Sequence, residues 1–289
     1  MIDEPLCVRL ELENRPENVA IVRAALAGVA EAAGFDEELA TDVKTAVSEA
    51  CNNVVIHAYE GRSGPLRVLV SSTRDRVDVV VGDVGTGIRR LSSGADHMGL
   101  GLALISALAD QAEFTSPPSG GTEVRIRFRR GGDTLDAGFP RNDQWPQWPA
   151  PLADGGVVVW CEPVPLVGYL FGRIARAAAA SSHFTMSGAQ DLYAINDAIA
   201  GVAEVAADGH LVFGITPAAH RLVLEAGPML ISPRAEPADG NPPDGGQAVE
   251  VRTRTDVLAD LVDQLSFERH DGASMMRMLV LDRGHTRAA

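Results

Sequence analysis

Hydrophobic and polar positions follow regular periods over the first 130 residues, and they predict seven elements. Alternation predicts strands over residues 6–12, 66–72, 76–82 and 122–128. Helical spacing predicts helices over residues 16–33, 36–59 and 100–111. Gly34 is expected to end the first helix and Asp36 to cap the second. The order β-α-α-β-β-α-β indicates an α/β fold, an α+β sandwich with a mixed sheet and helices on one face.

The second half repeats three segments of the first, faintly and in the same order. The matched pairs are residues 26–33 with 199–206, 76–82 with 221–227, and 121–128 with 272–279. We interpret the pattern as a duplication. In the first half, about thirty residues lie between the first helix and the strand pair. In the second half, almost no residues lie between the segment that matches this helix and the strand pair. The second copy is therefore expected to be smaller and degenerate, without a counterpart of the 36–59 helix.

These patterns predict two domains joined by a linker. The domains are expected at residues 1–130 and 157–289, with the second a degenerate pseudo-domain. Residues 131–156 are rich in proline and glycine and carry Trp145 and Trp148. Disordered linkers seldom contain tryptophan, so we expect this one to pack on a domain surface.

Composition and charge exclude several classes of protein. Of the 25 basic residues only Lys44 is lysine, and no glycine-rich loop precedes it, which excludes a P-loop. The net charge of −14 argues against direct binding of nucleic acid or anionic membranes. Three scattered cysteines and an acidic N-terminus favour a cytoplasmic protein.

Three motifs in the first domain carry candidate chemistry. Glu49, Asn53 and His57 recur every four residues and share a helix stripe, where an amide oxygen beside a carboxylate suits hydrated Mg²⁺ and a proton acceptor. Asp83 follows a strand, so its carboxylate can accept from an exocyclic amine. The other candidates are small or backbone-donating positions: Gly85 and Gly87 after that aspartate, Gly99, Leu100 and Gly101 opening a helix whose amides can hold phosphate, and Thr122 before the last strand.

In this order the motifs resemble the ATPase fold shared by gyrase, histidine kinases and MutL, called GHKL or Bergerat-type. Residues 1–130 are most similar to the bacterial anti-sigma-factor serine kinases of the RsbW and SpoIIAB type, because of the S-E-A-x-x-N-x-x-x-H segment and the short loop between Ile88 and Gly99. The resemblance implies ATP and Mg²⁺ as cofactors. His97 stands where family members often carry an arginine near the γ-phosphate.

The resemblance also implies a role for each matched residue. Glu49 would be the catalytic general base, Asn53 the Mg²⁺ ligand and Asp83 the adenine partner. The glycines and Leu100 would shape the lid and phosphate site, and Thr122 would lie near the adenine.

The implied activity is phosphorylation of a STAS-domain anti-sigma antagonist by an anti-sigma factor that also binds a sigma factor. The alternative is a non-catalytic, ATP-dependent module that sequesters one of these partners, which the His97 substitution favours. A histidine-kinase relative is a third, weaker alternative. The chain is expected to act as a homodimer or, through its two halves, as an intramolecular pseudo-dimer.

Overall fold

The computed structural model describes residues 1–86, 96–118, 120–131, 139, 155–207, 209–229, 245–270 and 273–283. The chain divides into two compact units, unit 1 from Met1 to Val157 and unit 2 from Val158 to Ala289. Each unit is a sheet with helices, and each is described by itself below.

Unit 1 contains nine elements in the described residues. In chain order they are β1 (Leu6–Glu13), α1 (Pro16–Ala33), α2 (Glu37–Asn53), the π-helix η1 (Val54–Ala58), β2 (Pro65–Ser72), β3 (Arg76–Asp83), α3 (Asp96–Leu108), β4 (Gln111–Thr115) and β5 (Glu123–Arg129). The predicted α/β class is confirmed. The strand β4 was not predicted, and the sequence placed the end of the α3 helix at residue 111 rather than at Leu108.

The strands of unit 1 lie in the order β4-β5-β3-β2-β1, and every neighbouring pair is antiparallel. The expected mixed sheet was therefore wrong for this unit. The reason is β4, because this short strand forms a hairpin with β5 and returns the chain so that β5 runs antiparallel to β3.

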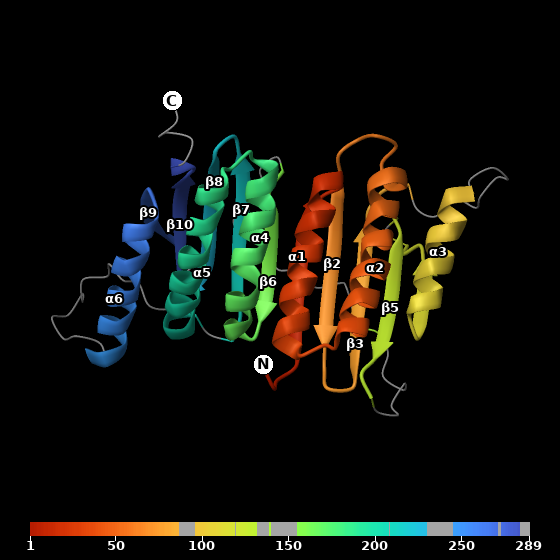
Figure 1. Cartoon of the computed structure of the whole chain (residues 1–289), viewed down its shortest axis with the longest axis horizontal. Coiled ribbons are helices and arrows are strands. Elements are labelled where there is room, and N and C mark those ends of the chain that lie inside the picture. The colour runs from red at the N-terminus through yellow and green to blue at the C-terminus, as the bar shows by residue number, and fades with distance from the viewer. Residues whose placement is uncertain are drawn as a thin grey trace. The chain divides into compact units, whose positions relative to one another are not determined.

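One face of this sheet carries the core. On β1 the apolar side chains are buried and the alternating polar ones are half-exposed, as the sequence pattern predicted. Val79 pairs with Ile126 across β3 and β5, and both side chains are fully buried. Figure 1 shows α1, α2 and α3 in one layer over the strands, with α1 against β1 and α2 against β3 and β5. This layering buries the aliphatic side chains that supply most of the driving force for folding.

The ends of the first two helices follow from single residues. Gly34 adopts a left-handed conformation with φ 67° and its N–H bonds the carbonyls of Ala30 and Glu31, as expected of a helix C-cap. The Asp36 carboxylate accepts a hydrogen bond of 2.8 Å from the Leu39 N–H, which confirms the predicted N-cap.

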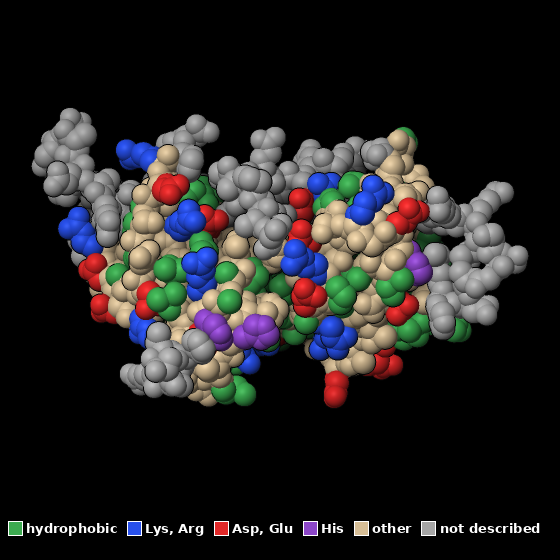
Figure 2. Space-filling view, turned by 90° about the horizontal axis from the view of Figure 1, so that it is seen from above, with side chains coloured by type: hydrophobic (Ala, Val, Ile, Leu, Met, Phe, Trp, Pro, Cys, Tyr) green, Lys and Arg blue, Asp and Glu red, His purple; other side chains and the backbone are tan. Residues whose placement is uncertain are grey.

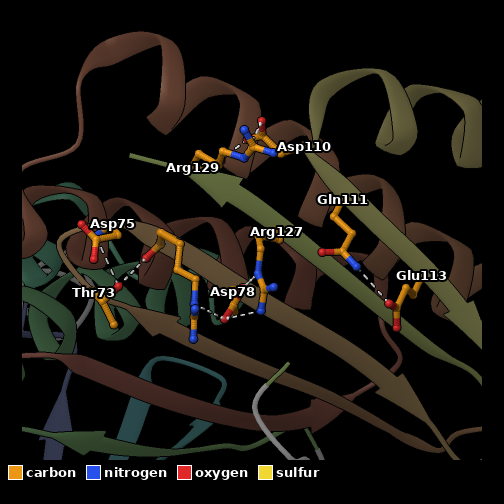
Figure 3. Close-up of polar contacts among 9 residues, drawn as sticks. Thr73, Asp75, Asp78, Asp110, Gln111, Glu113, Arg127 and Arg129 are labelled. Carbon is orange, nitrogen blue, oxygen red and sulfur yellow. Dashed lines mark hydrogen bonds and ion pairs between the residues drawn. The ribbon is translucent and has the colours of Figure 1, made fainter. Parts of the chain in front are cut away.

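The opposite face of the unit 1 sheet carries a buried ion pair. Arg127 on β5 donates two hydrogen bonds to Asp78 on β3, at 2.5 and 3.1 Å, and both side chains are almost fully buried (Figure 3). The Phe139 ring covers the Arg127 guanidinium, 4.4 Å from its centroid. Phe139 belongs to the segment expected to be a linker, so this part of the segment packs on the domain. Trp145 and Trp148 lie outside the described residues.

Unit 2 has eight main elements in the described residues. They are β6 (Val157–Glu162), α4 (Val167–Ser181), α5 (Met186–Ala206), β7 (Leu211–Ala218), β8 (Arg221–Met229), α6 (Gly245–Leu261), β9 (Gln264–His270) and β10 (Ala273–Leu281), with a short 3₁₀ turn η2 (Val164–Leu166) before α4. Two helices stand between its first strand and its strand pair. The expectation that the 36–59 helix has no counterpart here was therefore wrong, because α5 occupies that place.

Charge and hydropathy on the surface fit the composition. On the face shown in Figure 2, basic and acidic side chains are interspersed, and neither sign forms a continuous field. Among the described residues, no helix is both long enough and apolar enough to cross a membrane.

Candidate functional site

A pocket opens in unit 1 where β3 ends beneath the C-terminal turns of α2 and η1. Its lining comes from six elements and one loop: Ala50, Asn53, Val54, His57, Ala58, Val81, Asp83, Leu102, Phe114, Thr122 and Val124. Three of the residues predicted from sequence, Asn53, Asp83 and Thr122, therefore meet in one place. The remaining lining is mostly apolar, as is usual for a pocket that takes a flat organic ligand.

Asp83 is the buried charged group of this pocket, with 6% of its surface exposed. The Gly85 N–H donates a hydrogen bond of 2.7 Å to its Oδ1 atom. Burial raises the pKa of Asp83 above its ordinary 3.8, and hydrogen bonds from Gly85 and Thr122 act in the opposite direction. A carboxylate offers about four lone-pair positions, so these bonds leave acceptor capacity for a ligand amine.

The loop after Asp83 is fixed to the end of η1. The Tyr59 hydroxyl accepts a hydrogen bond of 3.0 Å from the Val84 N–H and donates one of 2.6 Å to the Pro65 carbonyl. The Thr86 N–H donates to the Ala58 carbonyl at 3.0 Å. A Cβ atom on Gly85 would lie 2.0 Å from that same carbonyl oxygen, so only glycine fits there. These contacts place Asp83 rigidly in the pocket.

Glu49 lies where α2 meets the beginning of α3. Its Oε1 atom is 2.2 Å from the position that a Cβ on Gly101 would take, so the carboxylate rests directly on the Gly101 backbone. Both predicted residues are thus brought together, although neither belongs to the pocket lining. The absence of a side chain at Gly101 lets the carboxylate lie against α3. Because α3 begins at Asp96, the expectation that Gly99, Leu100 and Gly101 open this helix was wrong, and Gly101 lies within it.

Asn53 passes a simple test for a magnesium ligand. Its amide nitrogen is buried and has no hydrogen-bond partner among the described residues. A buried NH₂ group without a partner is unusual, and as a donor it suits an acceptor on a ligand, such as a phosphate oxygen. An amide oxygen with phosphate oxygens and water suits the octahedral shell of Mg²⁺. The residues present therefore fit this ion.

The remaining predicted residues have mixed outcomes. Leu100 lies on α3 with 70% of its surface exposed, and Gly99 also falls within α3. Gly87 lies outside the described residues, as do Arg89 and Arg90. His97 falls within α3, but its side chain is not among those described.

Sequence reasoning missed the apolar lining of the pocket and the residue that holds the loop beside it. Phe114 and Leu102 line the pocket, and Tyr59 holds the loop after Asp83. The alternating segment Gln111–Thr115 was the signal for Phe114, since a strand there turns alternate side chains to one face. Cys51, on the buried face of α2, does not line the pocket, and burial raises the pKa of its thiol to about 12.

Comparison with known proteins agrees with this geometry. Residues 12–128 match the family model described as the histidine kinase-like ATPase domain. The serine-protein kinase RsbW of Bacillus cereus strain AH187 is 33% identical over 121 residues, which are 37% of this chain and 76% of that protein. The chain belongs to the RsbW-like family of anti-sigma-factor kinases. The RsbW of Bacillus thuringiensis subsp. konkukian strain 97-27 is also 33% identical, and that of Bacillus mycoides strain KBAB4 is 32% identical, each over the same length.

The family match covers unit 1 and leaves unit 2 outside it. The matched residues 12–128 begin within β1 and end within β5. The pocket, Glu49 and Gly101 all lie inside this range. The RsbW-like part of the chain is thus the part that carries the candidate site.

Proposed function

We propose that unit 1 binds ATP with Mg²⁺ and transfers the γ-phosphoryl group to a serine of a STAS-domain anti-sigma antagonist. The observation that carries the proposal is the convergence of Asp83 and Asn53 on one largely apolar pocket. A buried carboxylate that accepts hydrogen bonds suits the exocyclic amine of adenine. The amide oxygen of Asn53 suits the cation that accompanies the phosphates, and its unpartnered NH₂ group suits a phosphate oxygen.

In this mechanism the residues of unit 1 divide the work of binding and transfer. Asp83 accepts a hydrogen bond from the adenine amine, and Thr122 and Phe114 border the base. The N-terminus of α3 donates amide hydrogen bonds to the phosphates. Bound Mg²⁺, held by Asn53, would neutralise phosphate charge.

Glu49 acts on the substrate serine. Its carboxylate accepts the hydroxyl proton as the serine oxygen bonds to the γ-phosphorus, and the bond from that phosphorus to the β-γ bridging oxygen breaks, leaving ADP. Phosphoryl transfer depends chiefly on positioning and charge stabilisation, so Glu49 must be held in place before the substrate arrives. The contact with Gly101 provides that placement.

One observation favours a second candidate function, a non-catalytic module that sequesters its partner when ATP is bound. His97 replaces the arginine that family members often place near the γ-phosphate. A neutral imidazole gives less stabilisation to the transferring phosphoryl group than a permanently charged guanidinium.

The experiment that separates these functions is incubation of the full chain with labelled ATP and a STAS-domain protein from the same organism. The kinase predicts label on the STAS protein, lost with Glu49→Gln while ATP binding is retained. Glu38→Gln is the matched control, because Glu38 lies in the first turn of the same helix, about three turns before Glu49. Bound ATP and bound STAS protein without any transfer would support sequestration instead.

We further propose a cytoplasmic location, a sigma factor as the second protein partner, and no direct contact with nucleic acid or membrane. The RsbW naming of the relatives and the acidic net charge of −14 support these partners. The molecular mass in solution distinguishes the two forms of assembly. A mass of one chain indicates an internal pseudo-dimer, and a mass of two chains indicates a homodimer.

A further inference from the structure

Unit 2 repeats the architecture of unit 1 element by element. Both run β-α-α-β-β-α-β-β in chain order, apart from the short turns η1 and η2. The sheet of unit 1 reads β4-β5-β3-β2-β1, and that of unit 2 reads β9-β10-β8-β7-β6, which is the same order of corresponding strands. A shared order of elements and strands is a specific match, because five strands can be arranged in many ways.

The pairing register of the central hairpin agrees to the residue. In unit 1 Leu69 pairs with Val80, and in unit 2 Gly214 pairs with Glu225. Both residues of the second pair follow those of the first by 145 positions (214 − 69 and 225 − 80). This offset aligns β3 with β8 without a gap.

The same offset aligns α2 with α5. The buried stripe at Val47, Ala50, Val54 and Ala58 falls on four positions that are also buried: Leu192, Ile195, Ile199 and Ala203. The α5 helix thus corresponds to α2. The similarity between residues 26–33 and 199–206 had paired α5 with α1, and that pairing was wrong.

This alignment removes the three polar groups that have proposed chemical roles, whereas the offset that pairs Val124 with Met276 leaves a hydroxyl, Ser274, at the position of Thr122. Glu49 corresponds to Ala194, Asn53 to Ala198 and Asp83 to Pro228. Neither alanine nor proline can accept a proton, bind Mg²⁺ or accept a hydrogen bond from an amine through its side chain. The three changes fall on the three residues with proposed chemical roles, while the buried stripe between them stays apolar.

Apolar side chains fill the position of the pocket. Ile195 replaces Ala50 and Val202 replaces His57, with 0% and 1% of their surfaces exposed. On the last strand, Leu222 pairs with Val280 as Val77 pairs with Phe128, which places Met276 at the position of Val124. Met276 is also fully buried. Ile195 and Met276 are therefore larger than the pocket residues they replace, and Val202 replaces a polar ring by an apolar side chain.

The helix α6 takes the place of α3 in unit 2. The number of residues between the end of α6 and the start of β9 equals that between the end of α3 and the start of β4. The residue numbers of the two segments therefore differ by 153 (261 − 108 and 264 − 111). Arg254 then corresponds to Gly101, and buried Leu258 to buried Ile105. Arg254 donates a hydrogen bond of 3.1 Å to the Gly201 carbonyl on α5, which pins the two helices together.

From these correspondences we infer that unit 2 is a complete second copy of the ATP-binding fold that has lost its nucleotide site, so that each chain binds a single nucleotide. The loss came from substitution and filling, with no helix deleted. The absence of a site in unit 2 does not depend on kinase activity in unit 1, whereas the count of one nucleotide rests on the proposed function.

Photoaffinity labelling of the full chain with azido-ATP and Mg²⁺, followed by peptide mapping, tests the inference. We expect label on unit 1 alone, one nucleotide per chain in equilibrium dialysis, and a reduced occupancy in Asp83→Asn at ligand concentrations near the Kd of the parent protein. Label on residues 158–289, or two nucleotides per chain, would overturn it. A chain that binds no nucleotide agrees with the loss in unit 2 and refutes the proposed function of unit 1.

A second experiment introduces into the pocket of unit 1 the larger residue that unit 2 has at the same position. Ala50→Ile copies Ile195 into unit 1 and is expected to lower ATP affinity at least tenfold, while Ile195→Ala in unit 2 leaves it unchanged. Circular dichroism checks folding, and Ala50→Val serves if the isoleucine variant does not fold. Unchanged ATP affinity in a folded Ala50 variant, or a changed affinity in Ile195→Ala, would refute the correspondence.

Discussion

Replacing Asp83 by asparagine tests the adenine assignment with little change in shape. The asparagine Oδ1 can keep the 2.7 Å hydrogen bond from the Gly85 N–H, so the loop after β3 should stay in place. The other carboxylate oxygen becomes an NH₂ group, which faces the adenine amine donor to donor. Loss of a charge-assisted hydrogen bond costs about 1–3 kcal/mol, which is a factor of about 5 to 150 in Kd.

Titration calorimetry with Mg·ATP measures this loss, and GTP supplies a second readout. Guanine carries an oxygen acceptor where adenine carries the amine, so Asp83→Asn is expected to narrow or reverse the preference for ATP over GTP. Asp75→Asn, at an exposed turn before β3, is the matched control and should bind ATP like the parent protein. An unchanged ATP affinity in folded Asp83→Asn would refute the proposed role of this residue.

Four further outcomes follow from the site and the sheet. Glu49→Gln should lower the phosphoryl-transfer rate by about 10²–10⁴-fold in a single-turnover assay while ATP affinity holds, as expected for loss of a general base. Gly101→Ala should lower the same rate, because its Cβ would lie 2.2 Å from the Glu49 Oε1 atom and displace that carboxylate. Burial raises the pKa of Asp83, so on acidification this carboxylate is protonated at a higher pH than an ordinary aspartate, and ATP affinity should fall there. In calorimetry at several pH values, Asp83→Asn should not show this fall in affinity. The free energy of unfolding depends on pH in the opposite direction. Because the folded state binds the Asp83 proton more tightly than the unfolded state, the contribution of Asp83 to stability falls as pH rises from 3.8 through the raised pKa. Asp78→Ala should destabilise unit 1 by about 3–5 kcal/mol in denaturant unfolding, because it leaves the buried Arg127 guanidinium without its carboxylate.

The sequence was sufficient for most of unit 1 because its signals were local. Alternation in β1, the cap at Asp36 and the glycine at the end of α1 each depend on a few neighbouring residues. Asp83 and Asn53 could be proposed as neighbours in one site because their motifs adjoin strongly periodic elements, and the structure places both in one pocket. The strand β4 escaped because it has only five residues, and Phe114 escaped with it.

Unit 2 was harder because its signals are not local. Ala-rich helices resemble one another, so identity between residues 26–33 and 199–206 aligned a helix with the wrong partner. The β10 match was also displaced by one residue, since the structure places Met276 opposite Ala226 as Val124 lies opposite Val81. Only strand pairing and burial fix such alignments, because both depend on contacts between distant parts of the chain.

The comparison of the two units separates what the fold requires from what the site requires. At the register positions of Asp78 and Arg127, unit 2 pairs Val223 with Leu279, so this sheet position accepts an apolar pair as well as an ion pair. Buried ion pairs often stabilise no more than apolar residues of similar volume, because desolvation offsets their attraction. The buried stripe of α2 and α5, in contrast, is apolar in both units. Positions that stay apolar in both copies therefore belong to the scaffold, while Glu49, Asn53, Asp83 and Gly101 differ between the copies, as the proposed nucleotide site in unit 1 alone predicts.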